Sequence, residues 1–209
     1  QMARFANENG SSLLMGLLRR DPVTGSYYNS VAAWALSQPV QWYDKRRLVP
    51  FGEFFPVPQA VREWLRLMNL PYSDFQPGRA DPAPLRAAGE TFAPTVCYED
   101  AYGSEQLGLV RQSSLLVNVT NDAWFGDSTA PHQHLDISRM RALESGRAML
   151  RATNDGVTAL IGHDGALLGT LPQFQPGVLT GEVQPRTGLT PYARFGNWPI
   201  LAVLGLAFH

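Results

Sequence analysis

The fold is decided by residues 92–100, which read FAPTVCYED. The segment is mainly apolar from Phe92 to Cys97 and becomes polar directly after the cysteine. A short apolar run of this kind is typical of a buried β-strand. In α/β folds, active centres lie at the carboxyl ends of such strands. The segment therefore predicts an α/β protein with Cys97 at the end of an inner strand.

Strand and helix patterns alternate on both sides of this segment, as is typical of α/β folds. On its N-terminal side we expect strands at residues 12–18, 30–36 and 40–49 and a helix at 57–68. On its C-terminal side we expect a helix at 100–111, a buried strand at 115–119, a long helix at 131–151 capped by Thr129, a hairpin of residues 157–162 and 167–171 that turns at Asp164-Gly165, and a last strand at 178–183. The apolar face of the long helix would consist of Leu135, Met140, Leu143, Met149 and Leu150.

Composition limits the classes of protein to which the chain can belong. Of its 209 residues, 44% are hydrophobic and 17% are charged, against about 25% charged in an average soluble domain. These values exclude a disordered chain and a coiled coil. The formal net charge of −1 gives no basic field for a nucleic-acid partner. Nineteen glycines and sixteen prolines fit many short elements joined by tight turns.

The chain holds one cysteine and one lysine. With Cys97 alone, neither an internal disulfide nor a cysteine-based zinc site can form. The thiol is either a nucleophile at the strand end or a small buried hydrophobic group. The other basic side chains are arginines, so Lys45 suggests a site that a guanidinium cannot serve. Glu53 could reach back to Lys45 in a common pocket; alternatively, Lys45 forms a surface pair with Asp44 of little energetic value.

Three further features each allow two interpretations. His132 and His134 could suggest a metal site, but side chains two residues apart on a helix point in different directions, which favours polar residues at a helix start. Asn118 begins a glycosylation motif, but it lies within a predicted buried strand. The pair Trp124-Phe125, in a glycine-containing loop, is either an exposed apolar contact or part of the core.

Five motifs together resemble the catalytic domain of the bacterial apolipoprotein N-acyltransferase family. In chain order they are YDK at 43–45, LVPFGE at 48–53, CYE at 97–99, VTNDAWFG at 119–126 with PHQH at 131–134, and the segment from Arg147 to Asn154 and Gly156. Their order, approximate spacing and flanking residues agree over nearly the whole chain. The family belongs to the nitrilase, or carbon–nitrogen hydrolase, superfamily. The resemblance therefore implies an α/β fold of the four-layer αββα sandwich type, here truncated on its N-terminal side.

The resemblance also implies roles for five residues. Cys97 matches the nucleophile and Lys45 the lysine of a Glu-Lys-Cys triad. Glu53 matches a supporting acidic residue, and Tyr98 and Glu99 match residues that complete the site. The glutamate base of the triad normally lies in a Pro-Glu motif before the first strand seen here. We therefore expect this base upstream of the chain, and expect the isolated chain to be inactive. The resemblance implies neither a cofactor nor a metal.

The implied reaction is a ping-pong acyl transfer. A phospholipid acyl chain passes to Cys97 as a thioester and then to the α-amine of a diacylglyceryl-cysteine lipoprotein. The ammonium of Lys45 would favour the thiolate and then the oxyanion, with the backbone N–H of Tyr98 as a second oxyanion donor. The implied partners are a phospholipid donor, a lipoprotein acceptor and a membrane, with no nucleic acid. The implied location is the bacterial inner membrane, with the catalytic domain facing the periplasm.

On this interpretation the chain has two parts. Residues 1–192 form a partial nitrilase-like catalytic domain. By the same resemblance, residues 193–209 form a linker and the start of a C-terminal transmembrane helix. Their apolar run alone is shorter than the roughly 20 residues that span a bilayer, so it indicates either a buried core strand or part of a span.

Two other functions remain open. A soluble carbon–nitrogen hydrolase, such as an amidase or a nitrilase, would use the same triad with water as the acceptor. A non-catalytic binding domain on the same scaffold would have an unreactive Cys97. The apolar C-terminal end argues against the hydrolase, and so do five aromatic residues that suit a lipid-facing mouth: Phe54, Phe55, Trp64, Trp124 and Phe125.

Overall fold

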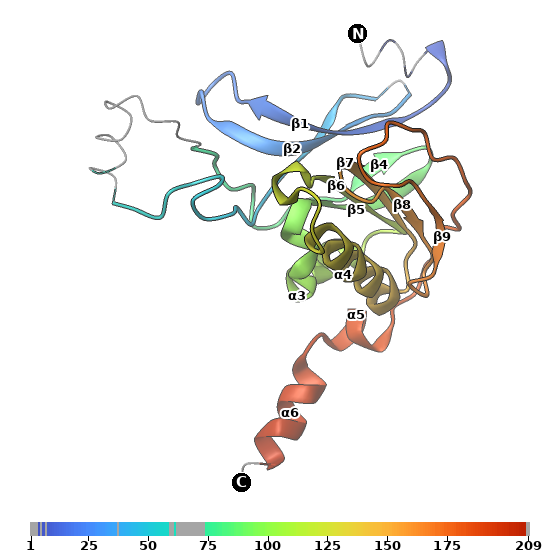
Figure 1. Ribbon diagram of the computed structural model, residues 1–209. Coiled ribbons are helices and arrows are strands. Elements are labelled where there is room, and N and C mark those ends of the chain that lie inside the picture. Colours follow the sequence, from blue (N-terminus) through green and yellow to red (C-terminus); the bar gives the residue numbers. More distant parts are fainter. Residues whose placement is uncertain are drawn as a thin grey trace.

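Two stacked sheets and a layer of helices form the body of the molecule (Figure 1). The computed structural model describes residues 8–36, 38–58 and 74–207, together with Arg4, Ala6 and Val61. A three-stranded sheet packs on one face of a six-stranded sheet, and helices α3 (Gly103–Val110) and α4 (Ala130–Ser145) cover the other face (Figure 1). These layers are the two sheets and one helical layer of an αββα sandwich, so the predicted fold class is confirmed.

The three-stranded sheet is antiparallel, in the order β1 (Leu13–Arg20), β2 (Tyr27–Trp34) and β3 (Gln41–Asp44). It approaches the larger sheet closely at Gly16, where an added Cβ would lie 2.9 Å from Cγ2 of Val119. Real Cβ atoms do not come so near to another side chain, so a glycine is required at this contact between the sheets.

The first three strand predictions are confirmed in position but not all in length. The strands predicted at 12–18 and 30–36 correspond to β1 and β2. The prediction at 40–49 is wrong beyond Asp44, where β3 ends. The chain then turns, and the N–H of Glu53 donates to the carbonyl of Val49 at 2.8 Å. This turn, rather than a longer strand, places Glu53 near the end of β3.

The six-stranded sheet has its strands in chain order: β4 (Leu85–Ala87), β5 (Glu90–Val96), β6 (Leu115–Asn121), β7 (Met149–Asn154), β8 (Ala159–Ile161) and β9 (Leu167–Thr170). Strands β5, β6 and β7 are parallel, and Val96, Val119 and Ala152 lie side by side near their carboxyl ends. The residues that follow these strands therefore meet at one edge of the sheet. Cys97 follows β5 and Asp122 follows β6 at this edge.

The long helix predicted at 131–151 is confirmed as far as Ser145 and wrong in its last six residues. Helix α4 ends at Ser145, because Gly146 adopts a left-handed conformation with a φ of 63° and closes the helix. The next residues form β7, a strand between β6 and β8. The predicted apolar face is also incorrect: Met140 and Leu143 are about half exposed. Thr129 stands at the N-cap position, but its side chain makes no capping hydrogen bond. The buried face of α4 consists of Pro131, His134, Leu135, Ser138, Ala142 and Ser145.

The other predicted helices and strands are confirmed in part. The hairpin of β8 and β9 and its Asp164-Gly165 turn are confirmed. The helix predicted at 100–111 is α3, which begins only at Gly103 after the short 3₁₀ helix η1 (Cys97–Ala101). The strand predicted at 178–183 is wrong, because this segment has no regular structure. The helix predicted at 57–68, including Trp64, lies outside the described residues except for Val57, Pro58 and Val61.

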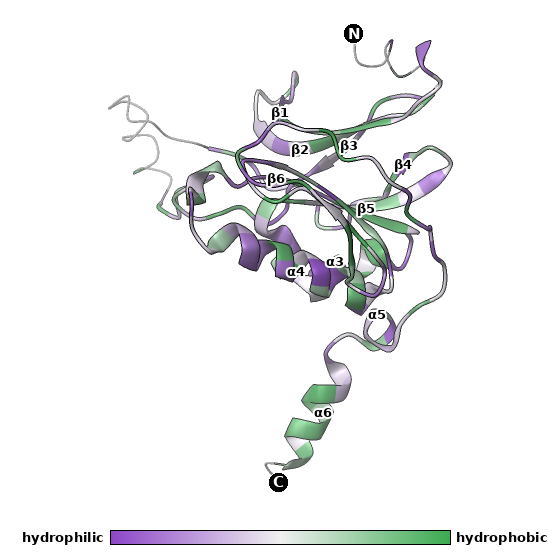
Figure 2. Cartoon of the chain, turned by 45° about the vertical axis from the view of Figure 1, so that its right-hand side comes forward, coloured by the Kyte–Doolittle hydropathy of each residue, from purple (hydrophilic) through white to green (hydrophobic). Residues whose placement is uncertain are grey.

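Two helices end the described part of the chain, α5 (Pro191–Phe195) and α6 (Trp198–Ala207). Helix α6 extends away from the sheets (Figure 1), and its residues are apolar and exposed (Figure 2). Within the ranges given above, no helix combines the length and the apolar character that crossing a bilayer requires.

Candidate active site

Cys97 lies on a sharp turn between β5 and η1. Its φ angle is 54°, in the left-handed region that residues other than glycine rarely adopt. A strained turn at the end of an inner strand is a known way to expose a nucleophile above a sheet, and Cys97 is partly exposed. The sequence predicted the position of Cys97 at the strand end. It gave no signal for the backbone strain.

Lys45 is buried and pairs with Glu53. Only 1% of the Lys45 side chain is exposed, and its Nζ lies 2.8 Å from Oε2 and 2.9 Å from Oε1 of Glu53. The N–H of Val49 and the side-chain amide of Asn29 donate to the same carboxylate at 2.8 and 2.9 Å. A carboxylate that is itself held in place therefore fixes the Lys45 ammonium. The alternative of a surface pair with Asp44 is wrong, since Asp44 pairs with an arginine instead.

The buried carboxylate of Glu99 joins the Cys97 turn to the segment that carries Lys45. It accepts hydrogen bonds from the N–H of Val96 at 2.9 Å, of Arg46 at 2.7 Å and of Arg47 at 3.2 Å, and from the Tyr43 hydroxyl at 3.1 Å. Burial raises the pKa of Glu99, and the backbone N–H donors oppose that shift by favouring the carboxylate. Donors from both segments thus occupy its oxygens, which is the geometry of a group that positions others.

The surface at this edge of the sheet is aromatic. The Tyr98 ring is half exposed and meets the Tyr102 ring edge-on, with ring centroids 6.2 Å apart. Trp124 is 90% exposed and Phe125 is 44% exposed. Of the two interpretations of the Trp124-Phe125 pair, the exposed apolar contact is therefore correct.

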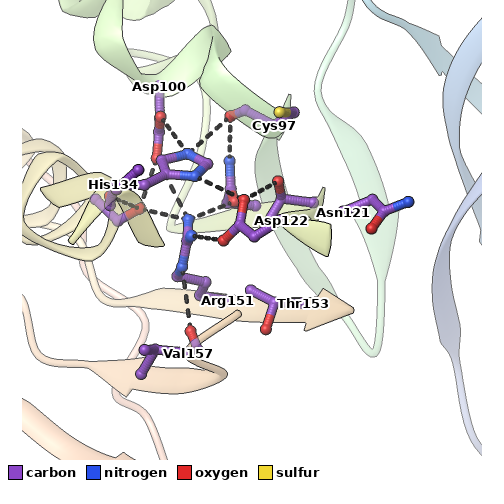
Figure 3. A network of polar contacts seen from close by, with 12 residues as sticks. Cys97, Asp100, Asn121, Asp122, His134, Arg151, Thr153 and Val157 are labelled. Atoms are coloured by element: carbon purple, nitrogen blue, oxygen red, sulfur yellow. Dashed lines mark hydrogen bonds and ion pairs between the residues drawn. The ribbon is translucent and has the colours of Figure 1, made fainter. Parts of the chain in front are cut away.

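A buried polar cluster lies behind the Cys97 turn, on the side away from the thiol (Figure 3). It consists of Asp100 of η1, Asp122 after β6, His134 of α4 and Arg151 of β7, and is called the His134 cluster below. His134 Nδ1 lies 3.1 Å from Oδ1 of Asp122, and Nε2 lies 3.1 Å from Oδ1 of Asp100. Arg151 Nη2 donates to Oδ2 of Asp122 at 3.0 Å.

His134 lies near the start of α4, as one interpretation expected, but its side chain is buried between two carboxylates, which that interpretation did not include. Two signals in the sequence could have indicated this. Arg151 stands among apolar residues, and Asp122 directly follows a buried strand. Charged side chains are rarely buried unless they are paired. A buried arginine therefore calls for a carboxylate partner elsewhere in the chain.

The charges of the His134 cluster are set by its mutual contacts. Burial by itself would lower the pKa of His134, but the hydrogen bonds to Asp100 and Asp122 outweigh it and raise the pKa to about 9. Burial opposes ionisation of Asp122, yet His134 and Arg151 hold the pKa of this carboxyl below its ordinary value. His134 is therefore a cation and Asp122 an anion at neutral pH.

The described ranges contain no group of three or more His, Cys, Asp or Glu side chains that could hold a metal ion. In the His134 cluster, both ring nitrogens of His134 already face protein oxygen atoms.

Comparison with known proteins finds relatives that match nearly the whole chain. Residues 1–192 match the family described as carbon-nitrogen hydrolase. The chain is 45% identical over 205 residues to the apolipoprotein N-acyltransferase of Nitrosomonas europaea and 47% identical over 201 residues to that of Chromobacterium violaceum. These alignments cover 98% and 96% of this chain but 41% and 39% of the relatives. The chain therefore spans about two fifths of their length.

Solved structures share the fold at low sequence identity. An amidase from Nesterenkonia sp. AN1, which carries the product of acrylamide addition at its active-site cysteine, matches with a TM-score of 0.62 and 17% identity over 97% of this chain and 73% of that chain. A carbon-nitrogen hydrolase from Helicobacter pylori G27 matches with a TM-score of 0.60 and 15% identity over 81% of this chain and 61% of that chain. At these identities the likeness concerns the fold alone.

Proposed function

The chain belongs to the carbon–nitrogen hydrolase family, and on that premise we propose that it is the catalytic part of an apolipoprotein N-acyltransferase. In this proposal, an acyl chain passes from a phospholipid to Cys97 and then to the N-terminal amine of a diacylglyceryl lipoprotein. Identity of 45% to an enzyme of that name across 98% of the chain supports this activity. It favours acyl transfer over hydrolysis by a soluble relative.

One observation of geometry carries the proposal. Cys97 stands on a strained and partly exposed turn, Lys45 is buried on a neighbouring segment, and the carboxylate of Glu99 joins the two segments. A thiol reacts as its thiolate, and a nearby ammonium stabilises that anion. The arrangement thus supports nucleophilic catalysis by Cys97 with Lys45 as its cationic partner.

The proposed reaction has two steps, acylation of Cys97 and transfer of the acyl group to the amine. First, the Cys97 thiolate attacks the ester carbonyl of the phospholipid; a C–S bond forms, the ester C–O bond breaks, and the thiol proton ends on the departing lysophospholipid oxygen. Second, the lipoprotein amine attacks the thioester; a C–N bond forms, the C–S bond breaks, and the amine proton returns to the thiolate. Each step passes through an oxyanion, which the Lys45 ammonium and the Tyr98 N–H stabilise.

Formation of the thiolate needs a base to accept the thiol proton. The two carboxylates described above, those of Glu53 and Glu99, already bind other groups. Glu53 binds Lys45, Val49 and Asn29, and Glu99 accepts from donors on both sides of the site. We therefore assign Glu53 to holding the ammonium and Glu99 to positioning. The proton transfer goes to a further glutamate of the full-length protein, as in the triad that the motifs resemble.

The proposed setting is the bacterial inner membrane, with the catalytic domain facing the periplasm. The exposed pair Trp124-Phe125 and the apolar helix α6 support contact with lipid. Residues 1–192 are the proposed catalytic domain. Residues 193–209 are the proposed linker and the start of a transmembrane helix.

The test uses the full-length protein in lipid–detergent micelles. After incubation with a dipalmitoyl phospholipid, peptide mass spectrometry is expected to find a palmitoyl group on Cys97 that hydroxylamine removes. Addition of a diacylglyceryl-cysteine peptide is expected to move the group to the peptide amine. A variant with Cys97→Ala controls for acylation at other side chains. Release of free fatty acid without acylation of the amine would support the hydrolase instead.

A further inference from the structure

The main-chain carbonyl of Cys97 is held by two side chains that the proposed reaction does not use. Asn118 Nδ2, from β6, donates to it at 3.0 Å, and His134 Nε2, from α4, lies 3.2 Å away (Figure 3). The strained backbone of Cys97 carries an energetic cost and persists only where its surroundings fix it. These two contacts therefore help to hold the turn.

His134 must donate from both ring nitrogens. Nδ1 faces a carboxylate oxygen of Asp122, and Nε2 faces a carboxylate oxygen of Asp100 as well as the Cys97 carbonyl. All three are acceptors, and an imidazole that meets acceptors at both nitrogens carries a proton on each. The ring is then an imidazolium, and its hydrogen bond to the Cys97 carbonyl is charge-assisted.

The rest of the cluster fixes these donors in direction and in charge. Arg151 Nη1 donates to Oδ1 of Asn118 at 2.8 Å, which turns the amide nitrogen of Asn118 toward the Cys97 carbonyl. The two carboxylates of Asp100 and Asp122 balance the two cations, His134 and Arg151. The four buried charges are therefore neutral as a set, which lets the imidazolium persist away from water.

The direction of the Cys97 carbonyl determines the direction of the next amide. The peptide bond between Cys97 and Tyr98 is planar and trans, because the described chain has no cis peptide bond. In a trans peptide the C=O and N–H groups point in opposite directions. With the carbonyl held in the His134 cluster, the Tyr98 N–H points away from it, toward the side on which the thiol lies (Figure 3).

We propose that His134 is a positioning residue: by holding the Cys97 carbonyl together with Asn118, it aims the Tyr98 N–H at the oxyanion that forms when Cys97 is acylated. The inference rests on the proposed function only in that the reaction it serves is acyl transfer to Cys97. It predicts that His134 affects steps that form an oxyanion and spares reactions of the thiol that form none.

The test compares two substitutions of His134 in the full-length protein, each of which keeps a hydrogen-bond donor at the position of only one of the two ring nitrogens. In His134→Gln the side-chain amide nitrogen can take the place of Nε2, so a donor toward the Cys97 carbonyl remains. In His134→Asn it can take only the place of Nδ1, so that donor is lost. The matched control is His132→Gln, since His132 is exposed on the same helix.

Two rates at Cys97 are measured for each variant. One is acylation by a p-nitrophenyl ester, which forms an oxyanion; the other is alkylation by iodoacetamide, which forms none. We expect His134→Asn to slow acylation by about 100-fold, with alkylation within about threefold of the wild type, and His134→Gln to stay within about tenfold for both. Equal acylation in all variants would overturn the proposal. A parallel loss of both rates would reduce His134 to a structural role and also overturn it.

Two further readouts keep the result interpretable. Failure of the wild type to accept an acyl group from phospholipid, with normal acylation by the p-nitrophenyl ester, would count against the proposed function alone. If His134→Asn does not fold, ¹⁵N-histidine NMR of the wild type replaces it. The expected spectrum shows a proton on Nε2 of His134 at pH 7.5, and an Nε2 without a proton would contradict the proposal.

Discussion

The two polar groups linked to the Cys97 turn are built in opposite ways. Lys45 and Glu53 lie eight residues apart on one turning segment, and 14% of the Glu53 side chain remains exposed. The His134 cluster draws its four members from four separate segments of the chain, and each is almost completely buried. The first group is local and is joined to the Cys97 turn through Glu99. The second is assembled only by the fold and reaches the thiol through the backbone.

The difference suggests that the Lys45 pair takes part in the chemistry, whereas the His134 cluster positions the groups around it. A buried cation beside the nucleophile stabilises charge that develops during the reaction. A buried cluster whose charges sum to zero does not stabilise the charge that develops in the reaction, but it holds its neighbours in fixed positions. Loss of one member leaves another charge unpaired, at a cost of about 3–5 kcal/mol. Changes on the Lys45 side should therefore affect rates, and changes on the His134 side should affect both stability and geometry.

The largest effect is expected at Cys97 itself, which both groups serve. In the full-length protein, Cys97→Ser is expected to abolish acyl transfer, because a serine hydroxyl is a far weaker nucleophile without a stronger base. Turnover is followed by gel shift of a lipoprotein substrate, and the variant's thermal unfolding should match the wild type. Turnover close to that of the wild type would show that Cys97 is not the nucleophile.

The next largest effect is expected on the Lys45 side. Lys45→Arg keeps the charge but replaces a compact donor with a broad guanidinium in a buried space. We expect acylation of Cys97 to fall by about 10²–10³-fold, the usual loss for an oxyanion donor. The matched control is Arg47→Lys, because Arg47 is an exposed partner of Glu105. Activity near wild type in Lys45→Arg would reduce Lys45 to a structural charge.

The same contrast explains what the sequence could predict. Local patterns located Cys97, Lys45 and Glu53, because each lies in a short motif whose residues act together. They also located β1, β2, β5 and β6, whose apolar runs are continuous. Local patterns could not predict the contacts of Glu99 with Tyr43, Arg46 and Arg47, because these donors lie more than fifty residues away in the chain.

The errors have one physical origin. The helix predicted through residue 151 fails because Gly146 ends α4 and tertiary pairing makes β7 a strand. The burial of His134 is beyond local patterns for the same reason, since the carboxylates that bury it come from other segments. Periodicity describes how a segment relates to itself. It carries no information about which distant segment will satisfy a buried charge.

On the His134 side, the third prediction concerns stability. Asp122→Asn preserves the shape of the side chain but removes one of two carboxylates that balance His134 and Arg151. We expect a loss of about 3 kcal/mol, seen as a fall of roughly 6–12 °C in the unfolding midpoint. Asp127→Asn, at an exposed position on the same loop, is expected to unfold like the wild type. Equal midpoints for the two variants would mean that the cluster contributes no stability.

The fourth prediction concerns pH, and its sign follows from His134. The pKa of His134 rises from its ordinary 6.5 to about 9 in the folded protein. Its stabilising contribution is therefore complete below pH 6.5 and is lost as the pH rises through 9. Asp100 and Asp122 face the ring, and Arg151 pairs with both of these carboxylates.

Relative to His134→Gln, the wild type is expected to lose stability by up to about 1.4 kcal/mol per pH unit between pH 6.5 and 9. Comparing the wild type with this variant removes the contributions of all other titrating groups. The unfolding midpoint of each protein is measured at half-unit steps of pH. Parallel curves for the two proteins would show that His134 does not carry the proton assigned to it.

The smallest effect is expected at the exposed end of the loop that begins in the buried cluster. Trp124 follows Asp122 by two residues, yet its side chain is 90% exposed. A large exposed aromatic ring at this edge suits contact with lipid. Trp124→Ala is therefore expected to raise the KM for phospholipid in mixed micelles about fivefold, equivalent to roughly 1 kcal/mol of lost apolar burial, while kcat and the unfolding midpoint stay unchanged. Val23→Ala, in the exposed turn between β1 and β2, is the control.

Because Asp122 and Trp124 share one loop, a kcat effect in Trp124→Ala would mean that the loop transmits changes to the Cys97 turn. An unchanged KM would instead remove this loop from the lipid-binding surface.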